Sequence, residues 1–179
     1  MQAQGVERWS PDDIVATPLD MYNTVVAAQW VDYNGHMTEA AYLTAAGWAT
    51  DVLFHYVGVD DAYRDGGHSF YTVETHIHYL VEVARGEPLR ITTQLLGLDA
   101  KRLHLHHEIL HGGSSSLLCT VEQMLVHVNM VAGRSAVILP GVFSALEAIA
   151  AAHAGLAIPS QVGSVMSISS SRRVSQPAD

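Results

Sequence analysis

The residues best suited to chemistry lie in one stretch, Trp30-Val-Asp-Tyr-Asn-Gly-His-Met-Thr-Glu-Ala-Ala-Tyr42. Residues 32–35 have the composition of a tight turn, because Asp, Asn and Gly accept turn conformations that most residues resist. The next run, 38–57, is rich in alanine and apolar on nearly every side, which predicts a buried helix. Asp32 and His36 are therefore expected beside the amino end of that helix. Unpaired N–H groups and partial positive charge at such an end would suit a developing oxyanion.

A strand before this turn and four strands after the helix would hold the stretch in place. Glycine often follows the last turn of a helix, so Gly58 is expected to end the long one. The other predicted elements are strands at 18–30, 69–83, 89–98, 102–111 and 117–131, a helical turn at 60–67 and a helix at 140–153. Strands joined by glycine-rich turns without intervening helices indicate an antiparallel sheet. The predicted fold class is α+β, with a curved sheet around one long helix.

The edges of such a sheet would be exposed, which favours edge-to-edge pairing of two chains as a homodimer or a dimer of dimers.

Within 69–83, strict alternation of side chains predicts two faces. The first face holds Tyr71, Val73, Ile77, Tyr79 and Val81, and the second holds Phe70, Thr72, Glu74, His76 and His78.

The composition is that of one globular domain with an acidic balance. The chain has 179 residues and a formal net charge of -9, which argues against nucleic acid or an anionic membrane as the main partner. The sequence has no signal-peptide pattern and no apolar run of membrane-spanning length. Cys119 is the single cysteine, which fits a reducing compartment, so the cytoplasm is the expected location. We expect a flexible arm at 1–16, one domain at 17–156 and a disordered tail at 157–179.

With this order of elements, the sequence resembles the hotdog-fold acyl-CoA thioesterases of the 4-hydroxybenzoyl-CoA thioesterase-like group. The resemblance covers roughly 24–129 and centres on Asp-Tyr-Asn-Gly-His-Met, followed by Ile-His-Tyr-Leu at 77–80. A closer resemblance, to the betainyl-CoA thioesterases of carnitine breakdown, extends over three segments: 30–37, 71–77 and 97–105. Those enzymes are often fused to a carnitine dehydrogenase, but this chain has no Gly-x-Gly-x-x-Gly dinucleotide motif. The resemblance implies hydrolysis of a short acyl-CoA, with betainyl-CoA as the first candidate.

The resemblance also implies roles for the residues of the turn. Asp32 would be the catalytic carboxylate, acting either as a nucleophile on the thioester carbonyl or as a general base for water. Asn34 and His36 would position water or the acyl group. The backbone N–H groups of Met37, Thr38 and Glu39 would hold the thioester oxygen. The alternative from the residues themselves is that Asp32 or Asn34 only caps the helix.

Other candidate residues lie outside the turn. Glu74 would reach the active site of a neighbouring subunit, or would simply be a solvated charge. An acyl group carrying a trimethylammonium would need aromatic faces, for which the candidates are Trp30, Tyr33, Trp48 and Tyr71, with core packing as their alternative. The phosphates of coenzyme A would need basic residues, for which the candidates are Arg85, Arg90, Lys101 and Arg102, although bends often expose such residues for solubility.

The histidines raise the question of a metal. His76-x-His78 and His104-x-His106 each place two imidazoles on one strand face, a spacing that can bind zinc or iron. The expected long helix argues against an all-β cupin, and we expect neither a metal nor a cofactor, since coenzyme A is part of the substrate. The alternatives are a thioesterase for another short or aromatic acyl-CoA, a non-catalytic acyl-CoA-binding module and, last, a metal-dependent cupin-like enzyme.

Overall fold

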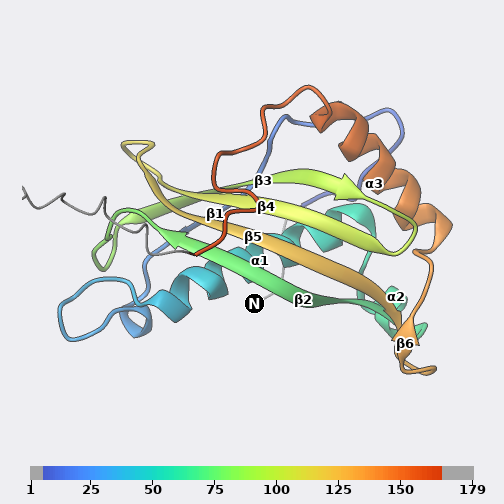
Figure 1. The fold of residues 1–179 in the computed structure, drawn as a ribbon, viewed down its shortest axis with the longest axis horizontal. Coiled ribbons are helices and arrows are strands. Elements are labelled where there is room, and N and C mark those ends of the chain that lie inside the picture. The colour runs from blue at the N-terminus through green and yellow to red at the C-terminus, as the bar shows by residue number, and fades with distance from the viewer. Residues whose placement is uncertain (1–5, 167–179) are drawn as a thin grey trace, which may run out of the picture.

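The computed structural model describes residues 6–166 as one antiparallel sheet with three α-helices (Figure 1). The sheet order is β1-β3-β4-β5-β2, and a short β6 pairs with β5. The strands are β1 (Leu19–Val25), β2 (His68–Tyr79), β3 (Pro88–Leu98), β4 (Arg102–His111), β5 (Leu117–Asn129) and β6 (Arg134–Ser135). The helices are α1 (Glu39–Val57), α2 (Asp61–Asp65) and α3 (Pro140–His153), with one 3-10 turn, η1 (Ala28–Trp30). The predicted α+β class and its one long central helix are confirmed.

The long helix α1 lies against one face of the sheet, which we call the inner face (Figure 1). Alanines on α1 pack against the strands of this face in one core cluster: Ala41, Ala45, Ala46 and Ala49 with Ile91, Ile109 and Val121. Larger side chains, Leu53 and Val57, fill a second cluster toward the end of α1. Small side chains let the helix approach the sheet closely, which is why an alanine-rich segment forms the centre of the fold.

A polar cluster ties the middle of α1 to the sheet inside this apolar core. The Thr50 hydroxyl lies 3.0 Å from Nε2 of His107 and 3.2 Å from Oε1 of Gln123. The hydroxyl of Thr93 lies 2.9 Å from Nδ1 of His107. All four side chains are buried, so each polar group depends on these partners. Burial lowers the pKa of His107 to about 4, which keeps the ring neutral at neutral pH.

The helix α3 covers β3 where the pairing between β1 and β3 ends. That pairing ends at Leu19 and Thr93, which leaves the N–H of Leu95 without a strand partner. The ring of His153, the last residue of α3, accepts that N–H at 3.0 Å and also bonds to the carbonyl of Ala16 at 3.0 Å. A histidine thus takes the place of a missing strand.

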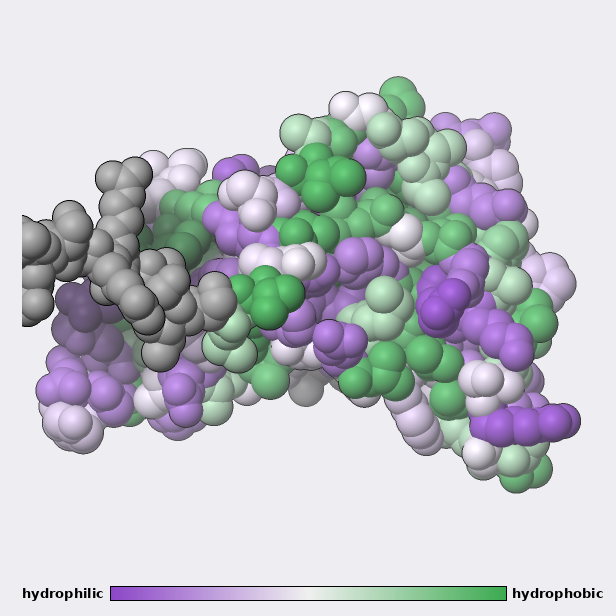
Figure 2. Space-filling model, viewed as in Figure 1, coloured by the Kyte–Doolittle hydropathy of each residue, from purple (hydrophilic) through white to green (hydrophobic). Residues whose placement is uncertain are grey.

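Beyond α3, the chain crosses the side of the sheet that faces away from α1, the outer face (Figure 1). We call residues 156–164 the strap. Figure 2 shows hydrophilic residues gathered over the middle of this face, beside the hydrophobic residues near the strap and α3.

The first strand is shorter than predicted. Residues 18–30 were expected as one strand, but β1 ends at Val25 and η1 follows. Val26 forms both of its backbone bonds with the turn after β2 rather than with β3, donating to Glu87 and accepting from Gly86. The chain then bends so that Trp30 enters the core.

The predicted faces of 69–83 are also wrong. A bulge lies between Thr72 and Glu74. One extra residue reverses the alternation beyond it. Tyr71 therefore shares the outer face with Glu74, His76 and His78. The inner face of β2 holds Phe70 and Thr72 before the bulge, then Ile77 and Tyr79, and the strand ends at Tyr79 rather than at residue 83.

Parts of the predicted arm and tail lie outside the described residues, namely 1–5 and 167–179. Within the described part, the N–H of Trp9 donates to the carbonyl of Tyr56 at 2.8 Å, and Trp9 packs against the second core cluster. The proposed boundaries at 16 and 157 stay predictions. No helix formed by residues 6–166 has the length and hydrophobicity needed to cross a bilayer.

Candidate active site

Asp32 organises the turn before α1. Its Oδ1 accepts the N–H of Asn34 at 2.8 Å, and its Oδ2 lies 3.3 Å from the Asn34 side-chain nitrogen. The backbone of Asp32 also donates to His36 and accepts from Gly35, both at 3.0 Å. Gly35 has a φ of 79°, a left-handed conformation that favours glycine. The carboxylate is held within an exposed loop and is free to meet a ligand.

At the amino end of α1, the N–H groups that are available to a ligand are not the ones predicted. Thr38 is the N-cap and its side chain forms no capping bond, so the alternative in which Asp32 or Asn34 caps the helix is wrong. The N–H of Met37 donates to Val83 at 2.9 Å and that of Thr38 to Trp30 at 2.8 Å, so neither can hold an oxyanion.

Two donors of the first helical turn are left for a ligand. Within residues 6–166, the N–H groups of Glu39 and Ala40 have no backbone partner. Of the three predicted donors, only the N–H of Glu39 is therefore available, and the N–H of Ala40, which was not predicted, is available next to it in the chain. The N–H groups in the first turn of any helix lack partners within the helix. The predicted start of the helix was therefore the feature of the sequence that pointed to these donors.

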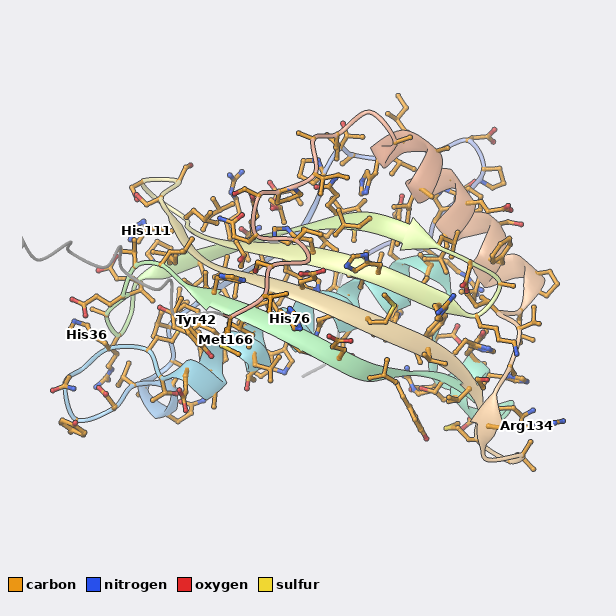
Figure 3. The ribbon with its side chains drawn as sticks, in the orientation of Figure 1. His36, Tyr42, His76, His111, Arg134 and Met166 are labelled. Atoms are coloured by element: carbon orange, nitrogen blue, oxygen red, sulfur yellow. The ribbon has the colours of Figure 1, made fainter. Side chains whose placement is uncertain are left out.

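The turn is docked on the segment that follows β2. His36 forms a bridge with Ala84, and its Nδ1 lies 3.4 Å from Oε2 of Glu82. The N–H of Arg85 donates to the carbonyl of Gly35 at 3.2 Å. His36 lies at the same end of the sheet as His111, whose Nε2 is 2.8 Å from Glu87 (Figure 3). The segment that carries Arg85 is thus held against the turn that carries Asp32 and His36.

Two tyrosines that the sequence analysis did not single out fix the helix start against β2. The Tyr42 hydroxyl donates to the carbonyl of Val81 at 3.3 Å, and the Tyr79 hydroxyl donates to the carbonyl of Glu39 at 3.1 Å. Their rings meet edge to face at 5.5 Å. Burial raises the pKa of Tyr42 to about 12, with Cys119 and Glu82 adding to the effect. The Tyr42 side chain therefore stays a neutral hydroxyl at neutral pH. The feature of the sequence that could have pointed to Tyr42 is its position in the first turn of the predicted helix.

The four predicted acyl-binding aromatics are only partly brought together. Trp30 and Trp48 pack at 4.9 Å between ring centres, and Tyr22 meets Trp48 at 6.5 Å. Tyr33, on the Asp32 turn, is 96% exposed, and Tyr71 lies on the outer face of β2. Among residues 6–166, neither of these two makes an aromatic contact with the tryptophan pair. Tyr22 is a further aromatic that the sequence analysis missed.

Glu74 stands apart from the turn within one chain. It lies on the outer face of β2, where its Oε1 is 3.0 Å from Nε2 of His76 (Figure 3). Cys119 is buried beneath α1, and burial raises the pKa of its thiol to about 12, so it is a core residue and not a nucleophile.

The four predicted phosphate-binding residues divide between the two ends of the sheet. Arg90 pairs with Asp20 at 3.2 Å near the start of β3, at the same end as Arg85. Arg102 pairs with Asp99 at 2.6 Å in the hairpin after β3, where Lys101 also lies. A strand the length of β3 spans about 30 Å. The two pairs are therefore not brought together.

The histidine-rich strands do not assemble a metal centre within residues 6–166, where no three His, Cys, Asp or Glu side chains are grouped as ligands. Instead, His104 lies 2.7 Å from Glu122 across two strands. The long helix and sheet order also exclude the cupin-like alternative.

The arrangement can polarise a carbonyl and attack it. An exposed carboxylate lies on the loop that leads into α1, and free N–H groups begin that helix. Donors aimed at a developing oxyanion, with a carboxylate in the same loop, suit acyl transfer from a good leaving group such as a thiolate. A curved antiparallel sheet around one long helix with this entry loop is the hotdog fold of thioester hydrolases.

Comparison with known proteins shows the family. The model of the thioesterase-like superfamily matches residues 26–146, and the chain belongs to that superfamily. The chain is 44% identical over 151 residues to the betainyl-CoA thioesterase of Pseudomonas aeruginosa (strain PAO1), covering 84% of this chain and 95% of that protein. It is therefore an acyl-CoA thioesterase with a hotdog fold.

Two further similar proteins are also described as thioesterases. The L-carnitine dehydrogenase/betainyl-CoA thioesterase of Rhizobium meliloti (strain 1021) is 46% identical over 146 residues, which are 82% of this chain. The matched part is 29% of that bifunctional protein. A crystal structure from Pseudomonas putida KT2440, described as that of a presumed thioesterase, superposes with a TM-score of 0.74 at 36% identity. It covers 84% of this chain and 97% of the crystallised chain.

Proposed function

We propose that this thioesterase hydrolyses betainyl-CoA, using Asp32 and the amino end of α1. The observation that carries the proposal is the exposed Asp32 carboxylate on the loop that enters α1, whose N–H groups at Glu39 and Ala40 are unpaired among the described residues. The names of the two betainyl-CoA thioesterase relatives support this choice of acyl group.

In the proposed reaction, the thioester carbonyl oxygen accepts hydrogen bonds from Glu39 and Ala40. The Asp32 carboxylate either adds to the carbonyl carbon or takes a proton from a water that adds there. The carbon–sulfur bond then breaks and coenzyme A leaves as a thiolate, which takes up a proton. If Asp32 adds directly, water cleaves the resulting mixed anhydride. Neither route needs a metal or a cofactor.

The betainyl group carries a quaternary ammonium, which aromatic faces and acidic side chains favour. The candidate face is the half-buried ring of Trp48 on α1, which packs on the buried ring of Trp30. A contact between such a cation and a ring contributes about 0.5–2 kcal/mol. Glu39 and Glu82 add negative charge at the end of the sheet where α1 begins, and the net charge of the chain, -9, also favours a cationic acyl group.

We further propose that the active form is a homodimer paired through β2. This strand is at an open edge of the sheet. Its exposed apolar side chains, and those just after it, include Tyr71, Val73, Tyr79, Leu80 and Val81. Covering such an edge with a second copy removes both the unpaired backbone and the apolar surface. Glu74 would then lie close to the neighbouring chain. The single, buried thiol and an acyl-CoA substrate favour the cytoplasm.

The substrate is tested by thiol release from betainyl-, acetyl-, 4-hydroxybenzoyl- and longer-chain CoA esters under matched conditions. We expect kcat/KM for betainyl-CoA to exceed that for acetyl-CoA by at least tenfold, because acetyl-CoA lacks the cation. Equal values for the two esters would reject the betainyl assignment, and a preference for 4-hydroxybenzoyl-CoA would replace it with an aromatic acyl group.

A further inference from the structure

A cavity of about 440 Å³ lies on the outer face, on the other side of the sheet from α1 and apart from the Asp32 turn. Its floor is made by β3 and β4 and its roof by the strap. Thr92, Gln94, His106 and Glu108 line the floor, and Pro18, Leu156 and Pro159 form apolar walls. The volume falls in the range of about 300–1,000 Å³ that is usual for small-molecule sites.

Four polar side chains form a square on the floor. In the antiparallel register, Thr92 lies opposite Glu108 and Gln94 lies opposite His106. Residues 92 and 94, like 106 and 108, are two apart on their strands, so all four side chains point to the same face. The two neighbouring strands β3 and β4 supply all four side chains.

The imidazole of His106 is left without a partner. Its Nε2 is buried and has no hydrogen bond, and the residue is only 2% exposed. A buried polar nitrogen without a partner destabilises the fold, and a hydrogen-bonding occupant of the cavity would remove that cost. Among residues 6–166, Glu108 and Thr92 also form no side-chain hydrogen bond or ion pair.

The roof is fixed by the strands beneath it. The Gln94 amide donates to the carbonyl of Ala157 at 3.3 Å. Farther along the strap, Glu122 accepts the N–H of Gly163 at 3.0 Å, and His78 lies 2.9 Å from the hydroxyl of Ser164. The cavity is therefore a formed space between two held surfaces.

The chemistry of the lining selects the ligand. Among residues 6–166, Glu108 is the only charged residue in the lining, and no lysine or arginine of this part of the chain contributes to it. Burial lowers the pKa of His106 to about 4, although Glu122 opposes the shift, so the ring is neutral and has a free acceptor nitrogen. The Glu108 carboxylate, the His106 ring and the Gln94 amide oxygen supply hydrogen-bond acceptors. Pro18, Leu156 and Pro159 supply apolar walls.

We propose that this cavity is a second binding site, for a small alkylammonium ion that carries N–H groups. The ammonium donates to the Glu108 carboxylate and to the free nitrogen of His106, and the alkyl group contacts the prolines and Leu156. The site is separate from the Asp32 turn and does not depend on which acyl-CoA the enzyme hydrolyses.

The experiment measures binding of isopropylammonium and tetramethylammonium chlorides to the full chain by titration with ¹H–¹⁵N NMR detection at pH 7.5. We expect saturable shifts of the Gln94 side chain and of the His106 ring with isopropylammonium. Tetramethylammonium, which has the charge but no N–H, is expected to bind at least tenfold more weakly. Equal binding of the two ions, or the absence of saturable shifts at these residues, would overturn the proposal.

Two variants locate the site. Glu108→Gln keeps the shape of the side chain and is expected to weaken isopropylammonium binding at least tenfold, whereas thioester hydrolysis stays unchanged. The matched control Asp65→Asn removes an exposed carboxylate of α2 and should change neither property. Unchanged binding by folded Glu108→Gln would contradict the proposal. If that variant does not fold, His106→Leu, which removes the free ring nitrogen, must weaken binding for the proposal to stand.

Discussion

At the scale of single residues, the chemistry depends on which polar groups the fold leaves free. The Asp32 carboxylate is held by Asn34 but is exposed. The N–H groups of Met37 and Thr38, which looked equivalent to that of Glu39 in the sequence, are occupied by carbonyls. An exposed carboxylate on the loop that enters a helix, together with unpaired donors at the helix start, can take part in chemistry, whereas a carboxylate that caps a helix would be structural.

Replacing Asp32 with asparagine should therefore remove activity without unfolding the protein. We expect kcat to fall at least about 100-fold, because the amide can neither attack the thioester nor accept a proton from water. The free energy of unfolding should change by less than about 1 kcal/mol, since an asparagine oxygen can still accept the N–H of Asn34. Asp12→Asn, at an exposed position before β1, is the control. Thiol release near the wild-type rate would reject the role of Asp32.

Tyr42→Phe tests how the helix start is fixed. The variant loses the hydrogen bond from the Tyr42 hydroxyl to the carbonyl of Val81, so that carbonyl loses its donor. We expect a loss of about 1 kcal/mol in the free energy of unfolding, measured with urea. Tyr33→Phe, at an exposed ring, should cause no change. A stable Tyr42→Phe protein would mean that water replaces the hydroxyl at no cost.

At the scale of elements, buried histidines connect strands and helices. His107 joins β4 to α1 through Thr50, His127 joins β5 to α2 through the Tyr63 hydroxyl at 2.8 Å, and His153 joins α3 to β3. Each ring uses both nitrogens. His153 must be neutral, because its Nδ1 accepts the N–H of Leu95. Burial lowers the pKa of each of these three rings and of His106.

These histidines predict loss of stability in mild acid. The folded pKa of each is below the unfolded value of about 6.5, so the unfolded chain binds more protons between the two values. The stabilisation is complete above pH 6.5 and is lost as the pH falls toward 4. Each ring contributes up to about 1.4 kcal/mol per pH unit in this window. Urea unfolding from pH 8 to 4.5 should show the decline.

The control is Tyr33→Phe, at an exposed ring for which the same decline is expected as in the wild type. His107→Gln should be less stable at pH 7 but should decline less steeply with acid. A free energy of unfolding that is constant between pH 6.5 and 4.5 would contradict this account of the core.

At the scale of the whole molecule, the proposed homodimer depends on the open edge of β2. Val73 is 60% exposed on this edge, beside Tyr71. An arginine there would place charge between paired strands, so Val73→Arg should shift the proposed dimer toward monomer, measured by sedimentation velocity. Val131→Arg, at an exposed position in the turn after β5, is the matched control. A wild-type chain that sediments as a monomer at micromolar concentration would contradict the proposed homodimer.

The sequence by itself determined the long helix, the strands after it, the acidic turn and the family. These features depend on local periodicity and on neighbouring residue types, which a single chain displays directly. A bulge adds one residue without altering the hydrophobic pattern, so the two faces of β2 were assigned wrongly beyond Val73.

Only the tertiary structure decided which donors of the helix start are free and which basic residues share an end of the sheet. Val83 and Trp30 occupy the N–H groups of Met37 and Thr38 from positions distant in sequence or across a turn. The square of polar side chains beneath the strap likewise depends on the register of β3 against β4. Hydrogen bonds between remote segments are formed only when the sheet is assembled, and no local pattern records which group they will use.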